Sequence, residues 1–310
     1  KTWFKRHFSY ACYGYFDLYR IVDVMRIFDR SGQELIVNQR QNQLLKFLYS
    51  HFLGRCALKV LTLPFITHIG GCYMNSRFSK RKIQPFIQQN QIDMSQYEKQ
   101  EYSCYNDFFT RKIKKEARPI CMEHDLLIAP ADSKLTYYPI HQDTYLTIKD
   151  TVYSLSDLLK NRSLAQEYDG GTCLIFRLTV DDYHRYCYID DGTKEQDIYI
   201  PGIFHTVNPV ANDYYPIYKQ NSRSYSLLHT QHFGDVIYME VGAMMVGKIV
   251  NHSKTSFQRG EEKGYFEFGG STIVVLFKKD MVVLDEDIIK NSQNNDETRV
   301  LMGEKIGIKR

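Results

Sequence analysis

The sequence predicts an α+β protein, in which a helical N-terminal region over residues 1–100 precedes a β-rich body over residues 101–310. Apolar residues in the first part recur at helical spacing. The second part contains short β-branched or aromatic runs, separated by glycine, proline, aspartate or asparagine, which are typical of strands. We find no internal repeat, and 310 residues with a mass of 36.5 kDa suffice for one large domain with a smaller element.

Residues 43–69 form the most apolar stretch of the N-terminal region. Leu48 and Phe52 lie one helical turn apart, so we expect helices here that break near Gly54 or Pro64. Lysine, arginine and histidine interrupt the stretch, whereas a membrane-spanning helix needs about 20 consecutive apolar residues. The stretch is therefore predicted to pack on the body or to lie in an interface, and not to span a bilayer.

The remaining elements follow from changes in periodicity. One helix is predicted over residues 79–90. Another is predicted over residues 154–166, with Ser154 at its start and Asp157 in its first turn. The asparagine-rich segment 291–296 is predicted to be a loop or disordered. Strands are predicted over residues 126–129, 135–138, 145–148, 173–178, 236–241 and 272–277.

Composition and charge exclude few classes of protein. A formal net charge of +4 is too small to indicate nucleic-acid binding, although a mild positive bias suits an anionic lipid surface. The start of the chain lacks the apolar run and cleavage site of a secretory signal. Widely spaced cysteines without a CxxC pair predict a reducing compartment, no disulfide framework and no zinc site; they are Cys12, Cys56, Cys72, Cys104, Cys121, Cys173 and Cys187.

The segment Gly269-Gly270-Ser271-Thr272 lies between two strand-like runs and places a hydroxyl beside a carbonyl that no side chain shields. On its own such a segment is far more often a plain turn. It also meets the needs of self-cleavage. Attack of the Ser271 oxygen on the Gly270 carbonyl converts the peptide into an ester, and β-elimination with hydrolysis then leaves an electrophilic pyruvoyl group at residue 271.

An ordered series of segments resembles the motifs of the phosphatidylserine decarboxylases. The resemblance covers roughly residues 75 to 310 and implies a proenzyme cleaved between Gly270 and Ser271. It further implies a pyruvoyl cofactor formed from Ser271, and decarboxylation of phosphatidylserine to phosphatidylethanolamine at a membrane surface. The segments are Phe108-Phe109-Thr110-Arg111-Lys112, Ala117-Arg118-Pro119-Ile120, Ala129-Pro130-Ala131-Asp132-Ser133-Lys134-Leu135, Arg177-Leu178 with Asp182-Tyr183-His184-Arg185, Val207-Asn208-Pro209, the run 241–249, and Gly269-Gly270-Ser271-Thr272.

The resemblance implies three catalytic residues. Ser271 is the nucleophile, His184 matches the histidine of the family's Asp-Tyr-His-Arg motif, and Asp132 matches its aspartate. An imidazole oriented by a carboxylate is the usual means of activating a hydroxyl, so we expect Asp132 to orient His184 and His184 to activate Ser271. The same histidine is our first choice to protonate the substrate carbon after decarboxylation.

One position departs from the family pattern. Many members carry a second histidine three residues after the first, where this chain has Cys187. Either His184 serves both maturation and decarboxylation, or His205 or His229 supplies the missing imidazole. Cys187 itself is a candidate only if its pKa is lowered; the alternative is a small buried residue that packs.

Substrate contacts are expected from the glycine-rich run after residue 241. Backbone amides near Gly242, Ala243 and Gly247 could hold a carboxylate or phosphate, because glycines let a ligand approach closely. Tight packing between strands explains the same glycines equally well. No set of metal ligands is predicted.

The implied partners are phosphatidylserine and an anionic membrane surface, with peripheral attachment at the cytoplasmic face and no nucleic acid. Because the implied substrate is a lipid, the interpretation of residues 44–66 as an interfacial helix deserves nearly the same weight as packing on the body. Chains 1–270 and 271–310 are expected to stay associated after cleavage, and the oligomeric state, including a homodimer, stays open. A different class also remains: a processing-deficient, β-rich lipid-binding or membrane-surface module, which the departure at Cys187 keeps in consideration.

Overall fold

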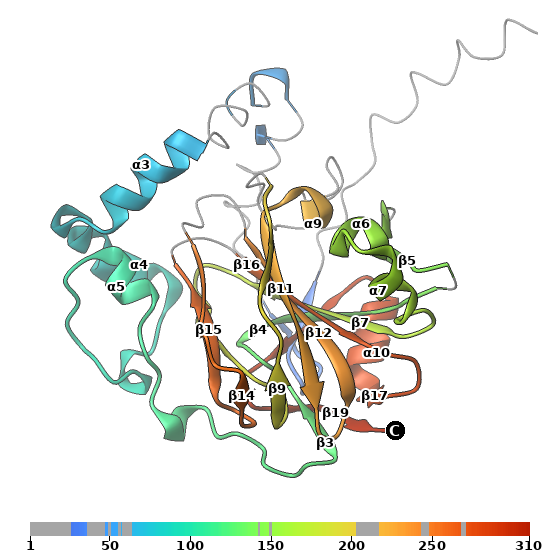
Figure 1. Ribbon diagram of the computed structural model, residues 1–310. Helices are drawn as coiled ribbons and strands as arrows, with labels where there is room; N and C mark the ends of the chain where they lie inside the picture. Colours follow the sequence, from blue (N-terminus) through green and yellow to red (C-terminus); the bar gives the residue numbers. More distant parts are fainter. Residues whose placement is uncertain are drawn as a thin grey trace, which may run out of the picture.

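The structure is a computed structural model that describes residues 26–35, 47–48, 51–54, 57, 64–141, 143–148, 151–202, 217–242, 248–267 and 271–310. An eleven-stranded sheet lies at its centre (Figure 1). Its strands are β1 (Ile27–Phe28), β2 (Glu34–Leu35), β4 (Ser133–Pro139), β7 (Thr172–Leu178), β9 (Gly192–Lys194), β10 (Ile198–Ile200), β11 (Arg223–Thr230), β12 (Gly234–Gly242), β14 (Ser256–Phe257), β16 (Ser271–Phe277) and β18 (Glu297–Val300).

The strand order of this sheet is β14-β9-β11-β12-β16-β7-β4-β18-β1-β2, and β10 pairs separately with β11. The β1–β18 pair is parallel, whereas β16 is antiparallel to both of its neighbours. Three smaller antiparallel sheets complete the body: β13-β15-β8, β17-β19-β3 and β5-β6. Their strands are β3 (Leu126–Ile128), β5 (Tyr145–Ile148), β6 (Thr151–Ser154), β8 (Arg185–Cys187), β13 (Ile249–Asn251), β15 (Glu262–Phe266), β17 (Val282–Leu284) and β19 (Lys305–Lys309).

Apolar cores cover both faces of the central sheet. Along β16, Ile273 and Val275 enter a first core, which also contains residues of β8 and β15. The alternate residues Val274 and Leu276 enter a second core, which includes residues of α6 (Leu155–Leu159) and α7 (Arg162–Gln166). A strand buried on both faces needs a continuous apolar run, and this explains the β-branched sequence of β16.

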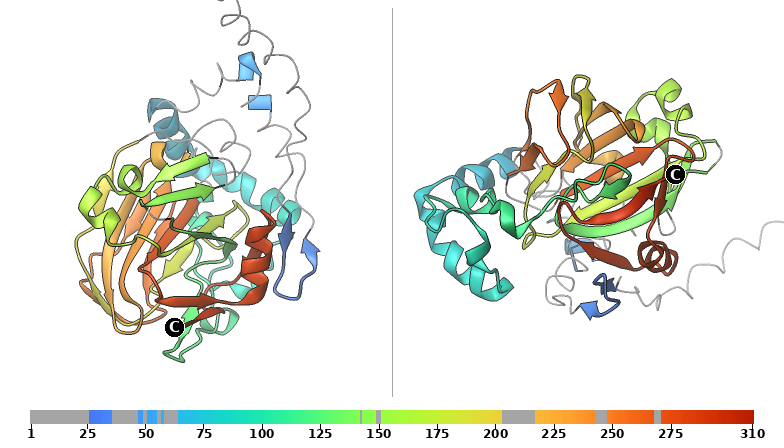
Figure 2. Two further views of the ribbon diagram at one scale, coloured as in Figure 1. Left: turned by 90° about the vertical axis from the view of Figure 1, so that its right-hand side faces the viewer. Right: turned by 90° about the horizontal axis from the view of Figure 1, so that it is seen from below.

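Three helices from residues 64–109 form a separate group at one side of the sheet, on the side of β15 in Figure 1, and the same group projects from the body in Figure 2. These are α3 (Pro64–Met74), α4 (Ile83–Asn90) and α5 (Tyr105–Phe109), with the 3-10 turns η1 (Arg77–Lys82), η2 (Met94–Gln96) and η3 (Lys115–Ala117). A third apolar cluster joins them, and its buried members are Met74, Ile83, Tyr102, Tyr105, Phe108 and Phe109. Two further helices are α9 (Ile217–Gln220) and α10 (Glu286–Gln293).

The predicted α+β class is confirmed, and a strand lies at each predicted strand position. Two strands also lie where only helices were expected: β1 and β2 come from the N-terminal region and extend the central sheet through β18. Much of the stretch 43–69 lies outside the described residues. No helix in the described part of the chain has the length and apolar character needed to cross a bilayer.

Two local predictions are wrong. The helix expected over residues 154–166 is two helices, because Lys160 adopts a left-handed conformation with φ 54° and Asn161 caps α7 by accepting the Leu164 amide at 3.1 Å. The segment 291–296 is a loop only over residues 294–296. It contains the last turn of α10, and the buried Asp296 accepts hydrogen bonds from Arg26 at 2.7 and 3.2 Å.

Candidate active site

Strand β16 positions Ser271 at the end of the central sheet. Ser271 pairs with Gly242 of β12 on one side and with Leu178 of β7 on the other. The alternation of β16 directs its side chain to the face of Ile273 and the first core, opposite to Thr272. Ser271 is fully buried, and its Oγ has no hydrogen-bond partner among the described residues. An unsatisfied buried hydroxyl costs about 1–3 kcal/mol, so its presence calls for an explanation.

His184 reaches this end of the sheet through β7. The chain turns after Leu178, and His184 then directly precedes β8, where its carbonyl accepts the Phe266 amide at 3.0 Å. Its Nδ1 lies 2.9 Å from the Asp182 carbonyl oxygen. Because a carbonyl only accepts, Nδ1 carries the ring proton and Nε2 holds the lone pair. Nε2 is buried and has no partner within the described residues.

Burial has the largest effect on the pKa of His184. It lowers the pKa of the imidazole to about 3, partly offset by the contact with Asp182 and reinforced by the positive charge of Arg111. The ring is therefore neutral at physiological pH. Only six side-chain atoms in the described part are buried without a partner, and two of them are the predicted nucleophile, Ser271 Oγ, and the predicted base, His184 Nε2.

The turn that carries His184 is fixed by Lys134. Its Nζ binds both carboxylate oxygens of Asp182, at 2.6 and 2.7 Å, and that carboxylate also accepts the Thr179 amide at 2.6 Å. Burial raises the pKa of Asp182, whereas Lys134 opposes the rise. The Lys134–Asp182 ion pair holds this turn in place. It thereby fixes the position of the Asp182 carbonyl, which accepts the Nδ1 proton of His184.

Helix α5 contributes a contact to His184 that the sequence analysis did not predict. The Phe109 ring lies against His184, with ring centroids 4.1 Å apart and planes tilted by 39°. Arg185 Nε donates to the Thr110 carbonyl at 2.8 Å and ties this segment to β8. Phe109 belongs to the segment Phe108-Phe109-Thr110-Arg111-Lys112. The resemblance therefore included this residue but did not indicate its contact with His184.

The structure corrects the expected role of Asp132. Its carboxylate binds Arg118, with Nε contacts of 2.8 and 3.0 Å and an Nη2 contact of 2.5 Å, and it accepts the Met302 amide at 2.8 Å. Within the described residues, no hydrogen bond joins Asp132 to His184. Asp132 instead anchors its own turn, in which the Pro130 carbonyl accepts the Cys187 amide at 2.9 Å.

We expect Asp132→Asn to lower the free energy of unfolding by about 3 kcal/mol. The variant leaves the mostly buried Arg118 without its counter-ion, and breaking one side of a buried pair is costly. Urea unfolding of the wild type and the variant measures the difference. Equal unfolding midpoints would contradict the anchoring role. Self-cleavage of the folded variant, followed in the same samples, tests separately for an effect on His184.

Cys187 lacks the properties of a reactive thiol. It is buried in the first core, and burial raises its pKa to about 12. Because a nucleophilic or basic cysteine needs a lowered pKa, this environment supports packing. His205, the first of the alternative imidazoles, lies outside the described residues.

His229 lies far from Ser271. It pairs with Asp235 across the β11–β12 hairpin, whereas Gly242, which pairs with Ser271, lies seven residues further along β12, about 23 Å at strand spacing. Its ring is partly exposed and binds Asp235 at 2.8 Å and Glu195 at 3.1 Å. This placement argues against His229 as the missing imidazole.

Of the three predicted substrate contacts, only Gly242 lies within the described residues, and Ala243 and Gly247 lie outside them. The Gly242 amide donates to the Ser222 carbonyl at 2.9 Å, and the Gly242 carbonyl accepts from Asn221 at 2.8 Å. The amide is thus already satisfied, so the expectation that Gly242 binds a substrate anion is not met. Gly270, on the other side of the predicted cleavage point, also lies outside the described residues.

Ser271 Oγ and His184 Nε2 are both buried and both lack a partner among the described residues, so no hydrogen bond joins them in this structure. A serine and an imidazole are nevertheless the residue types that activate a hydroxyl for attack. The family model for phosphatidylserine decarboxylase matches residues 105–308, and the chain belongs to this family. A protein of Clostridium acetobutylicum named phosphatidylserine decarboxylase proenzyme 2 is 50% identical over 283 residues, which cover 91% of this chain and 97% of that protein.

Two further relatives carry the name phosphatidylserine decarboxylase proenzyme. The protein of Clostridium botulinum is 45% identical over 273 residues, which cover 86% of this chain and 92% of the relative. The protein of Clostridium tetani is 41% identical over 277 residues, with the same coverage of 86% and 92%. The resemblance inferred from the ordered motifs is therefore confirmed.

Proposed function

We propose that this protein decarboxylates phosphatidylserine to phosphatidylethanolamine, after it cleaves itself between Gly270 and Ser271. One observation carries the proposal: Ser271 follows two glycines and starts β16 with a fully buried hydroxyl that no described residue binds. Buried hydroxyls usually have a hydrogen-bond partner, and Ser271 is the one among the unpartnered hydroxyls that directly follows the two glycines. The names of the relatives, which describe proenzymes, support the same interpretation.

Maturation uses residues of this chain alone. His184 Nε2 takes the Ser271 hydroxyl proton while Oγ attacks the Gly270 carbonyl carbon, and the C–N bond breaks as the ester C–O bond forms. Elimination then expels the Gly270 carboxylate from the Cβ of residue 271. Hydrolysis of the remaining enamine consumes one water, releases the nitrogen of Ser271 as ammonia, and leaves the pyruvoyl group.

The pyruvoyl group would supply a ketone that accepts electrons as carbon dioxide leaves. Position 271 fits such a group because it is fully buried between β12 and β7, which limits access of water. His184 remains our first choice to deliver a proton to the substrate carbon, and its Nε2, which holds a lone pair in this structure, would first have to take up that proton. Phe109, against its ring, limits the positions that the imidazole can take.

We further propose that chains 1–270 and 271–310 remain associated. The small chain would contain β16, which lies inside the central sheet with a hydrogen-bonded neighbour on each side, as well as β18, β19 and α10. Separation would expose β16 on both edges and both apolar faces, which is unfavourable. A division near residue 100 and a homodimer also remain proposals.

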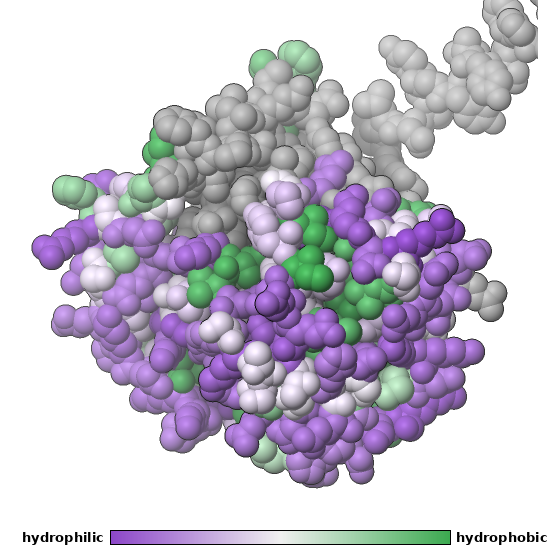
Figure 3. Space-filling view, in the orientation of Figure 1, coloured by the Kyte–Doolittle hydropathy of each residue, from purple (hydrophilic) through white to green (hydrophobic). Residues whose placement is uncertain are grey.

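Peripheral attachment to an anionic membrane at the cytoplasmic face is part of the proposal. Hydrophobic residues form patches near the middle of the face in Figure 3, around the place where Figure 1 draws α9, and the rest of this face is mostly hydrophilic. Phe78 is 75% exposed within the basic turn η1, and such a combination favours anionic headgroups. Large exposed apolar side chains of the N-terminal region are Phe47, Phe52, Leu53, Ile69 and Phe78.

We expect a double variant, Phe52→Glu with Leu53→Glu, to weaken binding to vesicles of anionic lipid while self-cleavage continues. These side chains are 71% and 73% exposed, whereas Leu48, on the same apolar stretch, packs against the second core and is a poorer probe. Vesicle flotation measures the binding. Val283→Glu, at a 42% exposed position on β17, is the matched control. Equal flotation of wild type and double variant would remove this stretch from the membrane surface.

Release of carbon dioxide tests the proposed reaction. Purified protein is incubated with phosphatidylserine labelled in the serine carboxyl group, and the label in carbon dioxide and the phosphatidylethanolamine formed are both quantified. The proposal requires equal amounts of the two. Self-cleaved protein that releases no label would overturn the assigned substrate but not the self-cleavage.

A further inference from the structure

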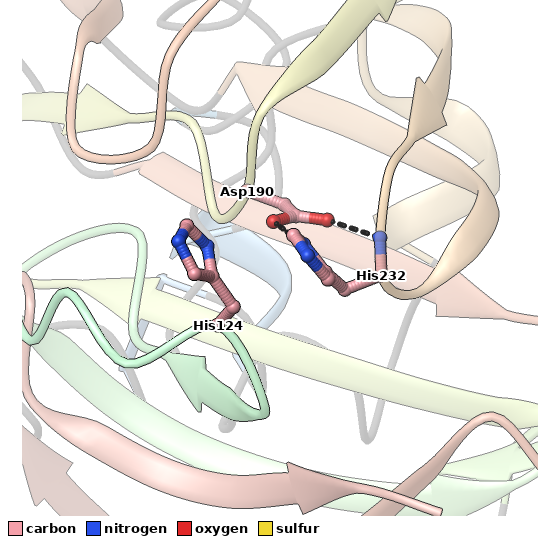
Figure 4. A group of neighbouring side chains, drawn as sticks. All are labelled: His124, Asp190 and His232. Carbon is pink, nitrogen blue, oxygen red and sulfur yellow. Dashed lines mark hydrogen bonds and ion pairs between the residues drawn. The ribbon is translucent and has the colours of Figure 1, made fainter.

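Three loops bring His124, Asp190 and His232 together on the body, as Figure 4 shows. His124 precedes β3, Asp190 follows β8, and His232 lies in the turn between β11 and β12. One ligand atom from each residue lies within 4.8 Å of the other two. The cluster is at the opposite end of β12 from Gly242, about 26 Å along the strand, and thus apart from the candidate active site.

Asp190 holds His232 through two hydrogen bonds. One carboxylate oxygen lies 2.8 Å from the His232 Nδ1, and the other accepts the His232 backbone amide at 2.8 Å. The Asp190 side chain is fully buried, and it forms no ion pair with a lysine or arginine among the described residues. A carboxylate on one ring nitrogen is the usual partner of a metal-binding histidine, because it fixes the ring and raises the basicity of the other nitrogen.

His124 completes the pair of imidazoles. Its ring lies nearly parallel to that of His232, with centroids 4.8 Å apart and planes 25° from parallel. His124 is exposed, so its ring can turn at little cost, and neither of its nitrogens binds a described residue. The His232 Nε2 is likewise without a described partner.

The loops are held before any ligand binds. Arg259 is buried and donates to three backbone carbonyls: Cys121 at 2.7 Å, Ile189 at 3.1 Å, and Leu126. Its own amide donates to Asp191 at 2.8 Å. These bonds connect the segment before β3 with the segment after β8, so much of the ordering that a ligand would require is already present.

We propose that His124 and His232 bind one divalent transition metal ion of the zinc, cobalt or nickel class, with Asp190 as the residue that positions His232. Imidazole nitrogens suit these ions, and no cysteine is needed. Two nitrogens on one tetrahedral ion lie roughly 3.4 Å apart, and the lone pair of each lies in its ring plane. The His124 ring must therefore turn out of its nearly parallel position against His232 to share an ion, and its exposure permits this. Water fills the remaining coordination positions. The ion would join three loops and stabilise the fold without entering the reaction.

Calorimetric titration of the purified, self-cleaved full-length protein, with any affinity tag removed, tests the site using zinc, and cobalt absorption reports nitrogen coordination. We expect the wild type to bind one ion per protein molecule, that is, per pair of cleaved chains. We expect His124→Gln and His232→Gln each to lose this binding. Asp190→Asn should bind about 10–100-fold more weakly, because it removes the positioning carboxylate. His252→Gln, which removes an imidazole bound to Glu262 at 2.8 Å, is the matched control and should bind as the wild type does.

His124→Gln is the decisive variant because its side chain is exposed, so loss of folding does not explain a result. Retained binding of one ion by His124→Gln would overturn the proposal, as would a wild type that takes up no stoichiometric zinc or cobalt. A wild type that melts at the same temperature with and without bound zinc would refute the stabilising role.

Discussion

Ser271→Ala should remain a single chain of 310 residues and release no carbon dioxide from phosphatidylserine. Alanine has no oxygen to attack the Gly270 carbonyl and cannot become a pyruvoyl group, so both activities disappear together. The fold should survive, because the hydroxyl of Ser271 has no described partner to lose. Denaturing electrophoresis after prolonged incubation shows whether a second chain forms.

Thr272→Val is the matched control for this variant. Thr272 is also fully buried and its Oγ1 also lacks a partner among the described residues, but its side chain faces the opposite side of β16. Valine keeps the shape and removes only the hydroxyl. We expect Thr272→Val to cleave at close to the wild-type rate. Cleavage of Ser271→Ala at the same bond, or a stalled Thr272→Val, would show that the wrong hydroxyl has been assigned.

The second large effect is expected at His184. His184→Gln should slow self-cleavage by about 10²–10⁴-fold, which is the usual contribution of a positioned base. Glutamine fills much of the space beside Phe109 but offers no ring nitrogen with a basic lone pair. The rate is followed from freshly synthesised proenzyme by electrophoresis. His229→Gln, at the other end of the β11–β12 hairpin, should mature as the wild type does.

The pH dependence of the free energy of unfolding provides a second test of His184. Its pKa is about 3 in the folded protein and near 6.5 when unfolded, so the unfolded state binds more protons between these values. His184 therefore destabilises the wild type as the pH falls through this window, and His184→Gln should lose part of that dependence. If His184→Gln matures at the wild-type rate while His205→Gln does not, the base has been wrongly assigned although the enzyme class stands.

Much of the body could be predicted because its strands are buried on both faces. The runs in β7, β12 and β16 are rich in apolar and β-branched residues, and each proved to be a central strand. Polar composition misled the prediction for residues 291–296, because the first three of them end α10 and the buried Asp296, which follows the helix, is held by Arg26. Lys160 broke a predicted helix through a left-handed conformation that lysine rarely adopts.

The sequence suggested candidate residues for the site but not their contacts. The motif order named Ser271, His184 and Asp132 as candidates, and the same segments contained Phe109 and Arg118 without indicating what these residues touch. The pairing of Asp132 with Arg118, in place of His184, depends on how the two turns meet in space. The His124–Asp190–His232 cluster has no sequence signature, since 42 residues separate Asp190 from His232 and no short metal-binding spacing includes the three.

The central claim is that Ser271 becomes a pyruvoyl group, and the intact mass of the purified wild-type protein under denaturing conditions tests it most directly. The account predicts two chains, residues 1–270 and 271–310, with the smaller chain lighter by one ammonia than the same peptide beginning with a free Ser271. A single chain of 310 residues would instead support the processing-deficient lipid-binding module. A small chain with a free serine at its start would contradict the proposed chemistry and leave only cleavage.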